Sequence, residues 1–134
     1  MVIVDAGPLI ALFDISEPLH QSCKDVLADL RKPLVTTWPA LTEAFYLLKG
    51  WDIGQHELWD FILSGGVRVS EIHEELYPRM RELMKKYSDS PMDLADASLV
   101  AVAEHHKIRK IFTLDRRDFL HYRPRHCTHF DIVP

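Results

Sequence analysis

The chain has no long run of apolar residues. A helix that crosses a lipid bilayer needs about 20 consecutive apolar residues, and no stretch of the 134-residue sequence approaches that length. The opening residues, Met1 to Asp5, also lack the basic region and the cleavage pattern of a secretory signal peptide. These two absences predict a cytoplasmic protein that has no contact with a membrane.

Cysteine is scarce as well. Cys23 and Cys127 are far apart and form no CxxC motif, which excludes a disulfide framework and a zinc finger. Among the eight histidines, the pair His105-His106 and the segment 126–129 could suggest a metal site of another kind. Adjacent residues on a strand point to opposite faces, and a solvated helix end accounts for a histidine pair, so we favour these ordinary explanations.

Positive charge is in deficit. The chain has 16 Lys and Arg against 20 Asp and Glu, a net charge of −4, which argues against a protein that coats nucleic acid nonspecifically. The distribution is uneven: residues 1–104 hold nine basic and seventeen acidic residues, whereas residues 105–134 hold seven and three. This C-terminal segment could face phosphates, with Arg116 and Arg117 as candidates. An ordinary solvated face explains these arginines equally well.

Three tryptophans, Trp38, Trp51 and Trp59, could stack on bases or line a partner interface. Tryptophan is more often a buried or half-buried packing residue. We therefore expect packing roles for all three and leave them out of the predicted site.

The pattern of apolar residues predicts a sheet covered by helices. With 134 residues, 47% of them hydrophobic, the chain has the size of one domain, residues 1–134. Five runs have strand character: 2–5, 34–37, 67–70, 110–114 and 128–133. Six segments have helical spacing: 8–13, 17–30, 39–50 with Gly50 as the stop, 56–63, 73–87 and 91–106. Because helices supply the long crossovers that parallel strands need, we predict an α/β fold in three α/β/α layers, with a mainly parallel five-stranded sheet.

Two acidic residues follow predicted strands. Asp5 ends the first strand and Asp115 ends the fourth. Open α/β sheets bind ligands at the carboxyl ends of their strands, so we expect both carboxylates on one rim, where they repel each other. A bound cation would relieve that repulsion, and oxygen ligands alone favour a hard cation, Mg²⁺ or Mn²⁺.

Helices can bring further carboxylates to this rim. Asp93 and Asp96 are three residues apart and share a helix face with apolar neighbours. Asp93 fits a capping box that begins at Ser90, so we predict a capping role for it and choose Asp96 as the helix ligand. Glu43 interrupts an apolar helical segment, where a solvated position or a favourable charge near the helix start explains it when it is taken alone. The three other acids favour a place for it in the site.

Four segments of the chain resemble the motifs of the PIN-domain family. The opening Val2–Leu12 resembles its hydrophobic first strand, which ends in an aspartate. Leu41–Ala44 resembles its glutamate helix, Leu94–Ala101 its aspartate helix, and Phe112–Phe119 its Thr-x-Asp strand end. The pieces occur in the family's order over residues 2 to about 119. Within the family, the resemblance is to small prokaryotic VapC-like proteins, which are usually the toxins of toxin–antitoxin pairs.

The resemblance implies a function, partners and a set of site residues. Such proteins cut RNA with Mg²⁺ or Mn²⁺, commonly form homodimers and pair with a small antitoxin protein. Carried over by position, the four catalytic acids would be Asp5, Glu43, Asp96 and Asp115, supported by Thr113, with Asp93 and Asp118 as lesser candidates. Asp5 and Asp96 would be the firmest metal ligands. Asp115 and Glu43 could bind through water, hold a second ion or take a proton from the attacking water.

Two other functions remain as alternatives. A PIN-like module could hold RNA or a partner protein without cleaving anything, although the complete set of four acids speaks against it. An α/β phosphatase or phosphotransfer domain also gathers aspartates around Mg²⁺, with paired acids or a nucleophilic aspartate after the first strand. Here Asp5 is followed by Ala6-Gly7-Pro8, which does not match that design.

Overall fold

The computed structural model describes residues 1–134 and is built around a five-stranded sheet. The strands are β1 (Val2–Val4), β2 (Leu34–Thr36), β3 (Val67–Val69), β4 (Lys110–Phe112) and β5 (Asp131–Val133). Their order across the sheet is β3-β2-β1-β4-β5, and all four neighbouring pairs run parallel. The predicted α/β fold is confirmed, and its sheet is parallel throughout.

All five strands are shorter than predicted. At β1 and β4 the chain leaves the sheet early, because Asp5 and Asp115 serve as the N-caps of the helices that follow. Residues 128 and 129 belong to a bend ahead of β5, and residue 130 also lies outside the strand. The predicted strands are too long for a physical reason. Strand propensity depends on the side chains of these residues, whereas helix capping decides where the backbone leaves the sheet.

Seven α-helices and two 3₁₀ turns connect the strands. They are α1 (Ala6–Phe13), α2 (His20–Asp29), α3 (Trp38–Leu48), η1 (Trp51–Ile53), α4 (Gln55–Leu63), η2 (Glu74–Leu76), α5 (Tyr77–Lys86), α6 (Leu94–His106) and α7 (Arg116–His121). The predicted helix 73–87 divides into η2 and α5. Helix α7 was not predicted, because six residues are too few to display a 3.6-residue period. None of the helices combines the length and apolar content that a bilayer crossing requires.

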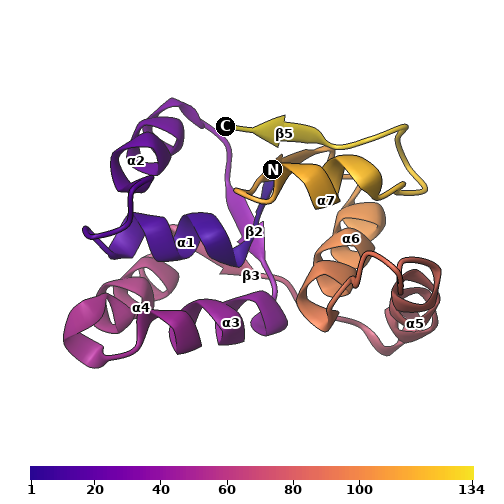
Figure 1. Ribbon diagram of the computed structural model, residues 1–134, viewed down its shortest axis with the longest axis horizontal. Coiled ribbons are helices and arrows are strands. Elements are labelled where there is room, and N and C mark those ends of the chain that lie inside the picture. Colours follow the sequence, from indigo (N-terminus) through magenta and orange to yellow (C-terminus); the bar gives the residue numbers. More distant parts are fainter.

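The helices cover both faces of the sheet, with α1 to α4 on one side and α5 to α7 on the other (Figure 1). The side chains of β1 alternate between these two layers. Val2 and Val4 are buried in the core shared with α1 to α4, whereas Ile3 is buried in the core shared with α5 to α7. The predicted three-layer α/β/α arrangement is therefore confirmed.

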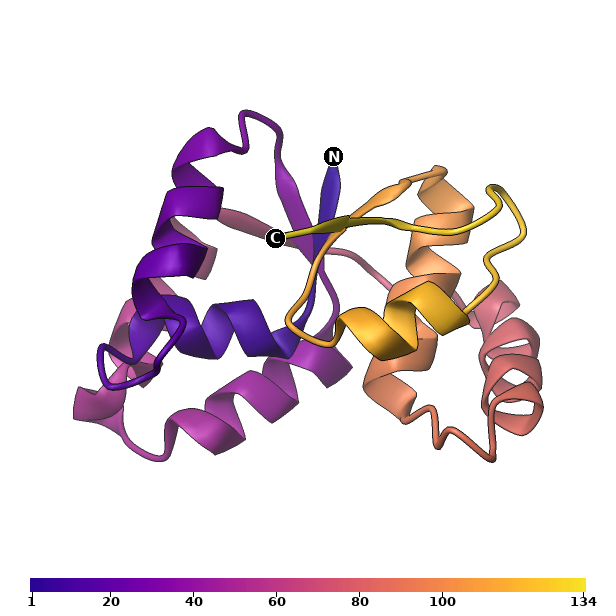
Figure 2. The same ribbon diagram turned by 45° about the horizontal axis from the view of Figure 1, so that its top comes forward.

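The order of the strands places a switch point between β1 and β4. From β1 the chain steps outward through β2 to β3, and it then returns to the other side of β1 for β4 and β5. The strand ends at this point lead into α1, α3 and α7 at one end of the sheet (Figure 2). Open α/β sheets bind ligands in the crevice at such a point.

Gly54 connects η1 to α4 in a conformation that suits only glycine. Its φ is +107°, and an added Cβ would collide with the carbonyl oxygen of Phe13. The change Gly54→Ala is therefore expected to lower the free energy of unfolding by at least about 2 kcal/mol, measured by chemical denaturation.

Gly65→Ala is the matched control for that substitution. Gly65 also has a positive φ, +85°, but no atom lies within 4 Å of the added Cβ. It should show only the backbone cost of a positive φ, about 1 kcal/mol. Equal losses in the two variants would mean that the contact with Phe13 contributes nothing.

Candidate acidic site

Asp5 lies at the switch point, and its carboxylate accepts two hydrogen bonds, one from the start of α1 and one from the residue that follows β4. Its Oδ1 accepts a hydrogen bond from the N–H of Ala6 at 2.8 Å, which caps α1. Its Oδ2 accepts one from the hydroxyl of Thr113 at 3.0 Å. Only 8% of the residue is exposed, so the position of this carboxylate is fixed by its surroundings.

Thr113 joins the ends of β1 and β4. Besides donating to Asp5, its Oγ1 accepts a hydrogen bond from the N–H of Asp115 at 3.0 Å. Asp115 in turn caps α7, with its Oδ1 3.4 Å from the N–H of Asp118. These contacts give a physical basis to the supporting role expected of Thr113.

Helix α6 contributes two acids from its first turn. Asp93 is the N-cap, and its Oδ1 accepts a hydrogen bond from the N–H of Asp96 at 2.8 Å. The expected capping role of Asp93 is therefore confirmed, but Asp93 is the N-cap residue itself and does not reach back to a cap at Ser90. Asp96 is the third residue of the helix.

The predicted cap at Ser90 is wrong. The residues that follow α5 close a turn, in which the N–H of Met92 donates to the carbonyl of Tyr87 at 3.2 Å. This turn delays the start of α6 to Leu94. A Ser-Pro pair is typical of both a turn and a helix start, and here the tertiary structure selects the turn.

Glu43 lies in the second turn of α3 and completes the set. It faces a hollow of about 380 Å³ between the ends of β1 and β4 and the starts of α3, α6 and α7. The lining residues are Asp5, Gly7, Glu43, Pro91, Asp93, Asp96, Leu114, Asp115 and Asp118. The fold thus brings together the four acids predicted as catalytic and both lesser candidates, and no Lys, Arg or His lines the hollow with them.

The donors of this hollow fit a hard divalent cation. Six carboxylates with no nitrogen or sulfur donor are the set that Mg²⁺ and Mn²⁺ prefer. As the side chains lie, no three Asp, Glu, His or Cys groups are close enough together to hold an ion directly. Mg²⁺ does not require such a group, because it keeps several waters and takes only one or two carboxylates from the protein.

Burial and mutual repulsion disturb these carboxyl groups. Burial is the main cause at Asp5 and raises its pKa to about 6, despite its two hydrogen bonds. Burial also raises the pKa of Asp96 to about 8, and the charges of neighbouring aspartates add to the effect. The pKa values of Glu43 and Asp118 are raised by burial first and by adjacent acids second. The ionised cluster is therefore costly unless a cation compensates it.

Tyr122 is a site residue that the sequence did not reveal. It is fully buried after α7, and its hydroxyl donates to Oδ2 of Asp96 at 2.7 Å. Its ring packs edge-on against Tyr87 and Phe119, with ring centroids 5.0 and 5.2 Å apart. Burial and the Asp96 carboxylate raise the pKa of Tyr122, so it remains a hydrogen-bond donor. No motif marks it, because its partner is 26 residues away.

Tyr122→Phe is expected to weaken metal binding without unfolding the protein. The ring stays, but Asp96 loses the hydrogen bond that favours its ionised form, so its pKa should rise further. The Mg²⁺ concentration for half-maximal thermal stabilisation at pH 7 should rise about 10-fold. The difference should shrink as pH rises from 7 to 9, because a growing fraction of Asp96 is ionised in both proteins; a pH-independent difference would contradict this explanation.

The structure distinguishes the two candidate arginines. Arg116 donates from Nη1 to the carbonyl of Pro134 at 3.0 Å. Arg117 instead lines a hollow of about 540 Å³ beside the acidic one, together with Asp118 and His121. Both arginines are exposed.

The tryptophans are half-buried packing residues at the surface, and none of them lies in the core. Trp38, Trp51 and Trp59 are 50%, 57% and 38% exposed. They lie on the outer side of α3, η1 and α4, where Trp38 and Trp59 contact each other with ring centroids 6.3 Å apart. The helices already bury their other faces against α1 and the sheet, so these rings have no core to enter.

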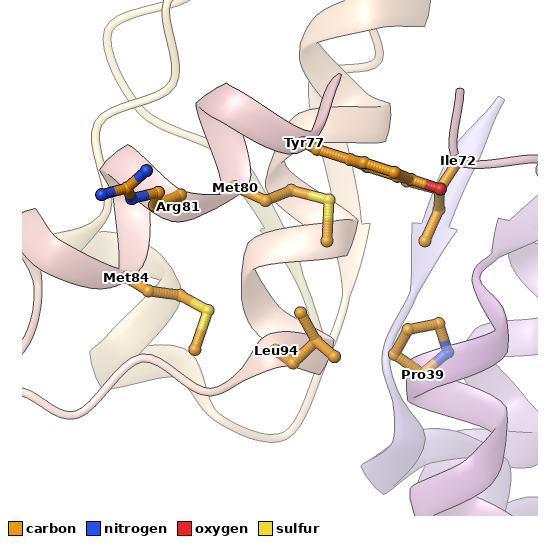
Figure 3. Close-up of a pocket in the computed structure, with 7 residues that line it drawn as sticks. All are labelled: Pro39, Ile72, Tyr77, Met80, Arg81, Met84 and Leu94. Atoms are coloured by element: carbon orange, nitrogen blue, oxygen red, sulfur yellow. The ribbon is translucent and has the colours of Figure 1, made fainter. Parts of the chain in front are cut away.

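A separate hollow of about 580 Å³ has an apolar lining. Tyr77, Met80 and Met84 of α5 lie across from Pro39 and Leu94 (Figure 3). Its remaining lining residues are Ile72 and Arg81. Such a concentration of accessible apolar side chains is typical of a contact surface.

A parallel α/β fold with a ring of acids at its switch point defines the class to which this protein belongs. The model of the PIN domain family matches residues 2–123, and the chain belongs to that family. A relative, Ribonuclease VapC26 of Mycobacterium tuberculosis, is 29% identical over 137 residues, which cover 99% of this chain and 100% of the relative.

Two solved structures share the fold. The crystal structure of Mycobacterium tuberculosis VapC20, a Sarcin-Ricin loop cleaving toxin, has a TM-score of 0.78 at 20% identity and covers 87% of this chain and 92% of that chain. A toxin–antitoxin complex from Klebsiella pneumoniae has a TM-score of 0.71 at 19% identity and covers 100% of this chain and 97% of that chain. The family resemblance and the PIN-like fold predicted from the sequence are confirmed.

Proposed function

We propose that the protein is a Mg²⁺- or Mn²⁺-dependent endoribonuclease that hydrolyses phosphodiester bonds in RNA. The observation that carries this proposal is the hollow at the switch point, which six carboxylates line and no positive side chain enters. Membership of the PIN domain family supports it, as does the similarity to proteins named Ribonuclease VapC26 and Sarcin-Ricin loop cleaving VapC20.

Asp5 and Asp96 are the residues that would hold the metal directly, and Asp115 would hold it through a metal-bound water. A bound ion would supply Lewis acidity, which lets water attack phosphorus at neutral pH and offsets charge on the leaving oxygen. Hydrogen bonds from Ala6, Thr113 and Tyr122 fix the carboxylates of Asp5 and Asp96 before substrate arrives. This preorganisation avoids the entropy cost of ordering the site during the reaction.

Glu43 is the proposed acceptor of the proton from the attacking water. It is exposed and enters the hollow from α3. Burial and the charges of Asp93 and Asp115 raise its pKa, which makes it a stronger base than an ordinary glutamate. Attack by water leaves a 5′-phosphate on the product and needs no histidine pair.

The proposed setting is a type II toxin–antitoxin pair, in which this chain is the toxin. The fold similarity to a Klebsiella pneumoniae toxin–antitoxin complex supports a small antitoxin as partner. The apolar hollow around Tyr77, Met80 and Leu94 offers surface for an antitoxin or for the second copy of a homodimer. We propose further that residues 1–134 act as one cytoplasmic domain.

Cleavage of a mixed RNA pool tests this function. We expect the wild type to produce fragments with 5′-phosphates in Mg²⁺ or Mn²⁺ and none in EDTA, and Asp96→Asn to be inactive. Asp52→Asn, a change of an exposed acid in η1 away from the hollow, is the matched control. Equal activity of Asp96→Asn and the wild type would refute the catalytic assignment. RNA binding without any cleavage by the wild type would favour the non-catalytic PIN-like module.

A further inference from the structure

The acidic hollow offers nothing positive to hold RNA on either side of the cleaved bond. Its nine lining residues include six acids and no Lys, Arg or His. Affinity for a nucleic acid comes largely from contacts to phosphates and from stacking on bases. A substrate must therefore find those contacts in the surfaces that continue the hollow outward.

One continuation is aromatic. A groove of about 580 Å³ between α3 and the start of α6 shares Glu43 and Asp93 with the acidic hollow. Trp38 and Tyr46 line it, and they are 50% and 74% exposed. They are eight residues apart on α3, which is about 12 Å along the helix axis. Trp59 packs against Trp38 at 6.3 Å and limits the freedom of that ring.

The other continuation carries an arginine and a histidine. The hollow of about 540 Å³ beside α7 shares Pro91 and Asp118 with the acidic hollow, and Pro91 is its one apolar lining residue. Arg117 and His121 line it from positions four apart on α7, hence from one face of that helix. The imidazole of His121 rests against the ring of Tyr87 at 5.3 Å, in an edge-on arrangement.

We propose that these three hollows form one path for a single-stranded segment of RNA, with unpaired bases stacked on Trp38 and Tyr46 and a phosphate contacted by Arg117 and His121. This inference rests on the proposed ribonuclease function. The path requires a single strand, because the faces of bases in a duplex are covered by their neighbours. Stacking on aromatic side chains tolerates every base, since each has a π-face.

A protein partner is the competing occupant of the aromatic groove. The groove shares Pro39 and Leu94 with the apolar hollow, which is the side from which a protein would reach it. We favour RNA because Glu43 and Asp93, two of the site's acids, border both the groove and the acidic hollow, so a strand that enters the acidic hollow from this side passes over the aromatic rings. On the other side, the exposed guanidinium of Arg117 is the group that can pair with a phosphate. Asp89 and Asp118 also line that hollow and repel phosphate. We therefore expect the contact to neutralise one phosphate charge only.

The test measures binding of the full chain to a fluorescent 2′-O-methyl octauridylate, with Ca²⁺ in place of Mg²⁺ and the integrity of the probe checked on a gel. Tyr46→Leu should weaken binding about 5- to 100-fold and leave its salt dependence unchanged, whereas Tyr46→Phe should bind like the wild type. Arg117→Ala should reduce the slope of log affinity against log salt by about 0.7. A 2′-O-methyl RNA duplex should bind more weakly than the single strand.

Matched controls come from exposed residues of the same types elsewhere. Trp51→Leu removes an exposed aromatic ring that lies outside the path, and Arg31→Ala removes a charge ahead of β2, at the opposite end of the sheet. Both variants should bind the octamer like the wild type. Losses in the controls equal to those in Tyr46→Leu and Arg117→Ala would overturn the proposed path.

Two further outcomes would overturn it while leaving the ribonuclease function intact. The first is an enzyme that cleaves RNA in Mg²⁺ although Tyr46→Leu and Arg117→Ala bind the octamer normally. The second is a Tyr46→Leu variant with normal octamer affinity but an altered sedimentation coefficient, which would make the groove a protein interface. Failure of the wild type both to bind the octamer and to cleave the RNA pool would instead reject the ribonuclease function and the path together.

Discussion

Asp96→Asn is expected to slow RNA cleavage by at least about 100-fold and, in the absence of metal, to make the protein more stable. Asparagine keeps the shape of the side chain and can still accept the hydrogen bond from Tyr122. It presents a neutral oxygen to the cation, so the lost activity reflects the lost charge. Lower activity together with higher stability is expected when a substitution removes one of several like charges that lie close together in a site.

The gain in stability follows from the raised pKa of Asp96. Its pKa is about 8 in the folded protein against an ordinary aspartate value of 3.8, so the folded state holds this proton more tightly than the unfolded state. The stability from this group is present at low pH and is lost as pH rises through 8. The Asp96→Asn variant does not lose this stability as pH rises, because asparagine does not ionise. It should therefore exceed the wild type at pH 8 by an amount on the order of 2 kcal/mol.

Denaturation in EDTA between pH 6 and pH 9 measures this difference. Asp5, with its pKa near 6, also titrates at the low end of this window, but it does so in both proteins, so its contribution cancels in the difference. The free energy of unfolding of Asp96→Asn should exceed that of the wild type by an amount that grows with pH and levels off above pH 8. Added Mg²⁺ should stabilise the wild type more than the variant, because a ligand stabilises only the state that binds it. A constant difference across the window would contradict the assigned cause.

Glu104→Gln is expected to cause the largest loss of stability, about 3 kcal/mol or more. Glu104 and Arg79 are 11% and 10% exposed and form two hydrogen bonds, at 2.9 and 2.8 Å. Glu104 also accepts the N–H of Arg125 at 2.7 Å. Burial by itself would raise the pKa of Glu104, but these partners hold it below its usual range. Removing the charge leaves the Arg79 guanidinium buried without its main counterion.

Glu82→Gln is the matched control for this prediction. Glu82 pairs with the same arginine, Arg79, at 2.6 Å, but its side chain is 55% exposed. Water screens such a pair, so its loss should cost less than about 1 kcal/mol. Thermal or chemical denaturation of both variants compares the two sites. Equal losses would show that burial does not decide the strength of this network.

Local sequence patterns determined the architecture and the composition of the site. Alternating strands and helices predicted the α/β sheet, because each element shows its period within a few residues. Asp5, Asp96 and Asp115 could be chosen because each follows a strand or interrupts an apolar helix face. Glu43 depended on the resemblance to PIN-domain motifs, since a solvated helix position explained it when it was taken alone.

Only the tertiary structure decided how the site is held and what surrounds it. The hydrogen bonds from Thr113 to Asp5 and from Tyr122 to Asp96 join residues 108 and 26 positions apart. No local period encodes such pairs. Packing likewise decided that the three tryptophans stay exposed and that α6 begins after the turn at residues 87–92. The sequence determined which chemical groups are present, because short-range periods are visible in it; the fold decided which of them meet, because those contacts depend on how distant elements pack together.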